Sequence, residues 1–523
     1  MSTTTTDSLV NLIHSLTKAE KRSFKLYANR NSSSPEELKF LQLFDFIDKS
    51  THYTDEQAVL KLKEIKKSQL SNIKAHLYKQ LLTSLRLQYI SHHIEIEIRE
   101  TIDYATVLYQ KAFYHQALKL LEKAKGLSIK ANASILTLEI VEFEKIIELQ
   151  FITRSIGSRA EQLTSQSREV QKHIDISTDF SDLALQLYSL YLKGGFARDE
   201  KDYHFVKEFF FSRLRTYRLE DLGFEEKMHL YNSYVWYHYI NQDFLMCYKY
   251  ARLWIDLFDE YPEMKSIRRE MHLKGMHNLL NALFNLRSYT RFSEELNGLV
   301  NYQFSDREQE NELILHQLYL YSNLINKHYL EGSFSDGLKL VPDILEFTKK
   351  YDQKLDAHRI MVFYYKIACL YFGSGMNKEA IVYLNLVVQF KEQTLREDIQ
   401  SFARILNLIA HFELGNDILV EYQIKSVYRF LIKMGDLHGV QKEILNFLRV
   451  LPMTERELLK SFKVLHGKLV KLSLLPFEKR PFLYLDIISW LESKLAGKPV
   501  QTIVRDKFRR EMETGNKLYF PVE

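Results

Sequence analysis

A glutamate and a histidine stand three residues apart at Glu226 and His229, a spacing that places both side chains on one face of a helix. Di-metal sites in helical bundles use this Glu-x-x-His pair twice, together with two further glutamates. This sequence contains one such pair and no His-Glu-x-x-His motif. We therefore interpret Glu226 and His229 as an ordinary pair at a surface or loop end, and we predict no bound metal.

The other residues that could do chemistry are equally isolated. Four glutamates cluster on one predicted helix without a histidine, which favours a solvated face; they are Glu139, Glu142, Glu144 and Glu148. Gly194-Gly195 predicts a loop or a helix defect, because no glycine-rich phosphate-binding motif surrounds it. Since no nucleophile, metal pattern or glycine loop converges with other polar residues, we predict that the chain is not an enzyme and uses no cofactor.

Two cysteines, Cys247 and Cys369, are the whole thiol content of the chain. Neither belongs to a Cys-x-x-Cys pair or lies near paired histidines, so both are predicted to be free thiols. This usage suits a reducing compartment. The N-terminus lacks the pattern of a signal peptide, and no window approaches about 18 consecutive apolar residues. We expect a cytoplasmic protein without a membrane span.

A basic stretch over residues 61–86 is the strongest charge feature, with a single acid, Glu64. Its lysines are Lys61, Lys63, Lys66, Lys67, Lys74 and Lys79. On a helix beside tyrosines, such a stretch could bind nucleic acid or an acidic protein. The simpler interpretation, which we favour, is a lysine-rich solvent face opposite a stripe of leucines. No recognition helix with base-reading residues after a short turn can be picked out.

Composition indicates which elements carry these residues. Only 17 glycines and 8 prolines occur in 523 residues, too few for the many tight turns of an all-β fold. Thr17–Glu20, Ser34–Glu37 and Thr54–Gln57 read as helix starts with reciprocal caps. A leucine stripe then predicts a long helix from Ser68 to His92. We expect an all-α protein whose residues 1–95 form an N-terminal helical module.

From residue 104 the sequence repeats. Residues 104–125 place small and large residues alternately at Ala105, Leu108, Tyr114, Ala117, Leu121 and Ala124, and residues 367–388 do the same around Ala368 and Ala380. Counterparts of Ala117 follow at intervals of 40 to 46 residues: Ala160, Val206, Cys247, Phe292, Gly337, Ala380 and Val420. The spacing within each unit resembles the tetratricopeptide consensus, although the period exceeds its 34 residues. A HEAT-like hairpin of similar period stays open.

The resemblance implies a right-handed α-solenoid of about eight hairpins over residues 96–450. Five of the eight prolines follow residue 450, so we expect a helical cap and tail over 451–523. The concave groove of the resembled family is lined from the first helix of each hairpin. Carried over position by position, the lining residues are Tyr109, Arg198, Trp236, Tyr239, Asn281, Asn326, Tyr329 and Phe372.

Asn281 and Asn326 share one register in successive repeats, eleven residues before their anchors. The resemblance implies amides that clamp an extended peptide, and the alternative is two exposed polar positions. We therefore expect a scaffold or adaptor that binds a protein or peptide on its concave face. The alternative function is a nucleic-acid-binding regulator that uses the basic module, with the solenoid as a sensor.

Overall fold

The computed structural model describes most of the chain, and all statements below concern that part. It covers residues 5–31, 35–50, 52–62, 64–90, 93–150, 158–304, 310–390, 396–435, 437–450, 454–475, 477–479, 482 and 486–514.

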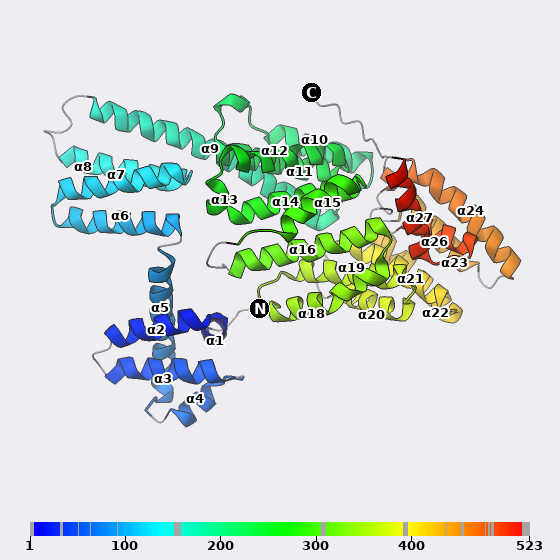
Figure 1. Cartoon of the computed structure of the whole chain (residues 1–523), viewed down its shortest axis with the longest axis horizontal. Helices are drawn as coiled ribbons and strands as arrows, with labels where there is room; N and C mark the ends of the chain where they lie inside the picture. Colours follow the sequence, from blue (N-terminus) through cyan, green and yellow to red (C-terminus); the bar gives the residue numbers. More distant parts are fainter. Residues whose placement is uncertain are drawn as a thin grey trace. The chain divides into compact units, whose positions relative to one another are not determined.

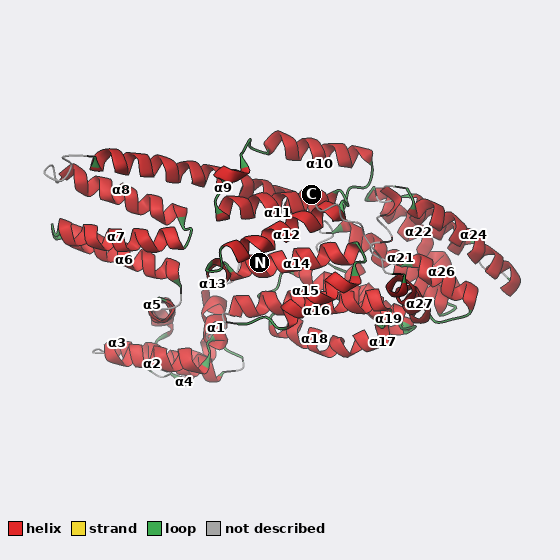
Figure 2. Cartoon of the chain, turned by 45° about the horizontal axis from the view of Figure 1, so that its top comes forward, coloured by secondary structure: helices red, strands yellow, loops and turns green. Residues whose placement is uncertain are grey.

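Every regular element in the described ranges is a helix, and no strand occurs there (Figures 1 and 2). The prediction of an all-α protein is confirmed. Short polar turns join most neighbouring helices, as expected for a chain poor in glycine and proline. No helix in the described ranges is long and apolar enough to cross a membrane. The chain divides into two compact units, Met1–Gln171 and Lys172–Glu523, a division that differs from the predicted boundaries at 95 and 450.

The first unit begins with four helices that pack around a fifth, longer one. They are α1 (Thr5–Ser15), α2 (Lys18–Asn31), α3 (Pro35–Lys49), α4 (Asp55–Lys61) and α5 (Lys67–Tyr89). The predicted leucine stripe of α5 is buried at Leu70, Leu77 and Leu81. The reciprocal cap at Thr17 and the Thr54 cap of α4 are both present, whereas Ser34 lies outside the described residues.

Three more helices complete the first unit: α6 (Ile94–Gln110), α7 (Tyr114–Lys130) and α8 (Ser134–Gln150). The close approach of α6 and α7 depends on small residues, since Ala105 and Ala117 are fully buried between them. The unit boundary falls inside α9 (Arg159–Gly194).

The second unit continues with helices that pack on their neighbours in sequence. They are α10 (Glu200–Arg213), α11 (Phe224–Ile240), α12 (Phe244–Glu260), α13 (Met264–Ile267), α14 (Arg269–Asn285), α15 (Tyr289–Val300), α16 (Glu310–Glu331), α17 (Phe334–Gly337), α18 (Val341–Lys350), α19 (Ala357–Gly373), α20 (Asn377–Val388), α21 (Glu397–Glu413) and α22 (Asp417–Lys433). Helices α14, α16, α19 and α21, the first helices of successive hairpins, also contact one another.

The turns of six hairpins share one conformation. A residue with a positive φ angle lies five positions before the predicted anchor in each: Ala112, Gln242, Arg287, Gly332, Gly375 and Gly415. A left-handed residue at this point ends the first helix and reverses the chain. The predicted anchors Ala117, Cys247, Phe292, Gly337, Ala380 and Val420 are all buried. Ala160 is exposed in the first turn of α9, and its assignment as an anchor was wrong.

Within the second unit, the end of α9 contacts the segment just before α21. The backbone N–H of Arg396 donates to the carbonyl of Leu192 at 3.0 Å, and its guanidinium lies over the ring of Tyr191. The same guanidinium forms two hydrogen bonds with Asp398, at 2.8 and 2.7 Å. Gly195 makes the approach possible, because its φ is +69° and a Cβ there would lie 2.4 Å from Oδ2 of Asp398.

The C-terminal helices are α23 (Gly439–Arg449), α24 (Glu455–Ser473), α26 (Ile487–Ala496) and α27 (Val500–Glu513). The predicted capping box at Thr454 is present at the start of α24. Trp490 on α26 donates from Nε1 to Glu413 at 2.7 Å, and α27 packs on α16. The last helices therefore fold back on the hairpins that precede them.

Candidate functional site

The residues assigned to the inner face fall into two groups by exposure. Asn326 and Phe372 are buried, at 2% and 5% exposure. The other six are half-buried: Tyr109, Arg198, Trp236, Tyr239, Asn281 and Tyr329. The alternative interpretation of Asn326 as an exposed polar position was wrong, because its side chain is buried and bonded to Asn323 and Lys366.

Asn281 and Asn326 belong to one network of polar side chains across three helices. Nδ2 of Asn281 lies 2.9 Å from Nε2 of His277, and Nδ2 of Asn323 lies 3.1 Å from Nδ1 of the same ring. Nδ2 of Asn326 donates to Oδ1 of Asn323 at 3.4 Å. Both amides thus have partners inside the chain, which a peptide backbone would have to replace.

Lys366 on α19 completes this network. Its Nζ donates to Oδ1 of Asn326 at 2.6 Å, and to Oγ and the carbonyl oxygen of Ser322 at 3.0 and 3.1 Å. These acceptors are all neutral, so burial lowers the pKa of Lys366 to about 7. Burial, followed by the charge of Lys366, also lowers the pKa of His277 to about 3. The network therefore holds a neutral imidazole and a lysine that titrates near neutrality.

Two of the aromatics predicted for the inner face pack into a cluster of other aromatic rings. Trp236 and Tyr239 lie among Tyr188, Tyr191 and Phe196, with ring centroids 4.8 to 5.9 Å apart. The Nε1 atom of Trp236 is nevertheless buried without a hydrogen-bond partner in the described structure.

The other half-buried residues predicted for the inner face also make contacts within the chain. The hydroxyl of Tyr329 donates to the carbonyl oxygen of Lys366 at 2.5 Å, and Tyr109 packs against Tyr114 and Phe143. Arg198 pairs with Asp202 and reaches the carbonyl of Met434 at 3.4 Å. Most of the residues predicted to line the inner face are therefore engaged in contacts within the chain.

The predicted basic patch is only partly a solvent face. Lys66, Lys67 and Lys79 are exposed, as is Lys61, whose ammonium lies over the ring of Phe46. Lys74 is buried and forms an ion pair with Asp55 at 2.7 Å, so its assignment to an open patch was wrong. Lys63 lies outside the described residues.

The solvent face of α5, opposite the leucine stripe, is polar and lacks acidic residues. Ser68, Asn72, Ala75 and Lys79 follow one another at intervals of three or four residues, and all are exposed. No acidic residue occurs between Glu64 and Glu95, and the N-terminus of α5 has neither an acidic first turn nor a side-chain cap. The short helix α4 and a brief turn precede it. This is a polar and basic helix face without negative charge.

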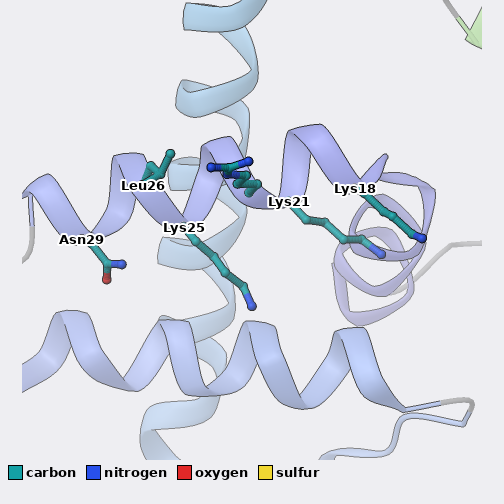
Figure 3. Close-up of a pocket in the computed structure, with 6 residues that line it drawn as sticks. Lys18, Lys21, Lys25, Leu26 and Asn29 are labelled. Atoms are coloured by element: carbon teal, nitrogen blue, oxygen red, sulfur yellow. The ribbon is translucent and has the colours of Figure 1, made fainter.

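A second basic surface lies on α2 (Figure 3). It is a shallow hollow of about 360 Å³ lined by Lys18, Lys21, Arg22, Lys25, Leu26 and Asn29. Two of its lysines are paired, Lys21 with Asp48 and Lys25 with Asp45. The run of basic residues in α2, which follows the cap residue Thr17, is the sequence pattern that could have predicted this surface.

Two acidic motifs prove to be structural. Glu226 is buried and lies 2.5 Å from Nδ1 of His173, whereas burial lowers the pKa of His229 to about 4. Glu144 is also buried, between Lys125 and Arg159. The interpretation of both glutamates as surface residues was wrong, because each has a basic partner inside the fold. No group of three or more potential metal ligands occurs in the described ranges.

A stripe of exposed apolar residues, interrupted by the exposed Lys425, runs along the solvent face of α22. Ile418 and Tyr422 are 88% and 79% exposed, and Tyr428 and Ile432 continue the stripe with about half of each side chain exposed. On α20, which like α22 packs against α21, Val382 and Leu386 are also exposed.

Comparisons with known proteins give no family for this chain. No family model matches it, and neither a curated protein nor a solved structure does so.

Proposed function

We propose that the chain is a non-enzymatic scaffold whose stacked helical hairpins bind a protein partner. The tetratricopeptide-like spacing supports this proposal, and the observation that carries it is the stripe on α22. Single exposed apolar residues are ordinary, but a row of four large ones on one helix is typical of an interaction surface. Since most of the residues predicted to line the inner face are engaged in contacts within the chain, we place the partner on the outer face of α20 and α22.

The test compares two variants of the full chain in a quantitative affinity purification from native lysate. Ile418→Ser with Tyr422→Ser removes the most exposed part of the stripe. Leu149→Ser is the matched control, because Leu149 is 82% exposed on α8, outside the stripe. The proposal expects a specific partner to be lost, at least tenfold, from the α22 variant and retained by the control. Equal recovery with both variants contradicts it.

A second candidate function is nucleic-acid binding through α5. Residues 1–90 contain 14 lysines and arginines against 9 acidic residues, whereas the remaining chain has 58 of each. The whole net charge of +5 is thus concentrated in the N-terminal helices, where the acid-free face of α5 is exposed. Exposed lysines contact phosphates, and exposed Gln69 and Asn72 have the side-chain type that reads adenine.

This candidate is tested by fluorescence anisotropy with duplex DNA and with single-stranded RNA over a range of salt concentrations. The triple variant Lys66→Glu, Lys67→Glu and Lys79→Glu should abolish binding. For the parent, the logarithm of the binding constant should fall with the logarithm of the salt concentration, with a slope that corresponds to several phosphate contacts. The matched control changes Lys425, Lys433 and Lys442, which are exposed in the second unit, to glutamate. If both triple variants lose binding equally, the attraction is unspecific and the candidate fails.

A further inference from the structure

Three helices of the second unit carry polar residues in two layers. Lys274 precedes Asn281 by seven residues on α14, Tyr319 precedes Asn326 by seven on α16, and Arg359 precedes Lys366 by seven on α19. Seven residues are two helical turns, so each member of a pair lies on the same face as the other. Because α16 packs against both α14 and α19, the first members form one layer and the second members another.

The second layer is connected by its own hydrogen bonds. Asn281, Asn326 and Lys366 are joined through His277 and Asn323, as described above. The ammonium of Lys366 has three acceptors for its three protons, so this cation needs no further partner.

The first layer has an excess of positive charge. Lys274 and Arg359 belong to this layer, and burial, followed by the charge of Arg359, lowers the pKa of Lys274 to about 8. No carboxylate oxygen in the described ranges lies within 4.0 Å of Nζ of Lys274. Asp356, the one acid paired with Arg359, is 3.9 Å away and its side chain is 56% exposed.

The surroundings of this layer add mainly hydrogen-bond donors. Tyr319 is buried and stacks on His277 at 4.3 Å; burial raises the pKa of its hydroxyl, and the charge of Arg359 opposes this effect. His229 on α11 feels the charge of Lys274, and the nearby Glu225 is engaged by Arg268 at 2.6 Å. On the α9 side, Tyr188 feels the charge of Arg359 and packs on Trp236, whose buried Nε1 lacks a partner. The layer thus holds two partly buried cations, several donors and a single, largely exposed counter-charge, Asp356.

We propose that the layer of Lys274, Tyr319 and Arg359 is a binding site for a small phosphate-bearing anion. A guanidinium presents a planar pair of donors that matches phosphate oxygens, and the ammonium adds a point charge. Lys274 and Arg359 are each half-buried, so part of each side chain is open to solvent. An anion there would neutralise the excess charge and join α14, α16 and α19. This inference goes beyond the proposed scaffold function, because it needs no protein partner.

The experiment is isothermal titration calorimetry of the full chain with inorganic phosphate, with pyrophosphate and with acetate, at constant ionic strength. We expect one saturable site for phosphate or pyrophosphate and at least tenfold weaker binding of acetate. Lys274→Met and Arg359→Met should each weaken phosphate binding at least tenfold, whereas Lys425→Met, which removes an exposed lysine on α22, should leave it unchanged. Circular dichroism melts establish that each variant is folded, and Lys274→Gln replaces Lys274→Met if the latter is not.

A second readout separates this site from unspecific attraction. A bound anion raises the pKa of Lys274, so phosphate binding at pH 8 should take up protons, which shows as a dependence of the heat on the ionisation enthalpy of the buffer. In the Lys274→Met variant this proton uptake on phosphate binding should be absent. Absence of binding at millimolar phosphate overturns the proposal, and so does equal weakening in Lys425→Met or equal affinity for acetate.

Discussion

Nζ of Lys366 lies 2.6 Å from Oδ1 of Asn326, and this hydrogen bond joins the first helices of two successive hairpins. The lysine has only neutral acceptors, so its charged form is poorly compensated in the folded chain. The folded protein therefore binds this proton less tightly than the unfolded chain does.

We predict a pH dependence of stability that belongs to Lys366. Burial lowers its pKa from 10.5 to about 7, so the charged lysine destabilises the fold fully below pH 7. This destabilisation is relieved as the pH rises from about 7 to 10.5, because the unfolded chain binds more protons over that range. The measurement is the difference in the free energy of unfolding between the parent and Lys366→Met at pH 6 to 10.

Two controls accompany this measurement. Lys425→Met removes an exposed lysine and should give a difference that does not change with pH in this way. Asn326→Asp supplies a carboxylate to Lys366, raises its pKa and should remove the increase in stability between pH 7 and 10. A flat difference for Lys366→Met would contradict the prediction.

Gly195→Ala should destabilise the second unit because of both backbone and side-chain strain. A left-handed alanine costs about 1 kcal/mol, and its Cβ would meet the carboxylate of Asp398 at 2.4 Å. We expect a loss of about 2–4 kcal/mol in chemical denaturation, as the overpacking adds about 1–3 kcal/mol. Gly375→Ala is the matched control: φ is +83° there, but no heavy atom lies within 4 Å of the added Cβ. Equal losses in the two variants would show that the Asp398 contact is not rigid.

The helix crossings at Ala117 and Ala380 should not tolerate larger side chains. Both residues are fully buried, so Ala→Leu at either should overpack the hairpin and cost about 1–3 kcal/mol. Thermal melts provide the measurement. Ala160→Leu, at an exposed helical position, should change the stability by less than about 0.5 kcal/mol. If all three variants melted together, the packing at the two crossings would have to be looser than the structure indicates.

Both cysteines should be inert in the folded protein. Cys247 and Cys369 are free thiols, and burial raises the pKa of Cys369 to about 12 and that of Cys247 well above its usual range. Alkylation at pH 8 followed by intact mass should show no adduct in buffer and two adducts in guanidinium chloride, since the thiolate is the reactive form. Rapid modification of either cysteine in buffer would show that the interior opens often.

Local patterns predicted the helices well, because periodicity, caps and turn residues act over a few positions. The anchors Ala117 and Ala380 and the cap at Thr454 are examples. The burial of Asn326 was not predicted, because its partner Lys366 lies 40 residues away. Asp55, the partner of Lys74, and Lys125, one partner of Glu144, each lie 19 residues away and were not predicted for the same reason. The site around Lys274 depends on three helices at once and has no local signal.

The hydrogen bond between Arg396 and Leu192 has a consequence for folding kinetics. Hairpins that touch only their neighbours can form one after another from any starting point. Here the two bonded residues are more than 200 positions apart, so the chain between them must be ordered before the bond is favourable. Such a non-local contact slows folding and couples the first and later hairpins of the second unit. We therefore expect this unit to unfold as one cooperative body, and not hairpin by hairpin.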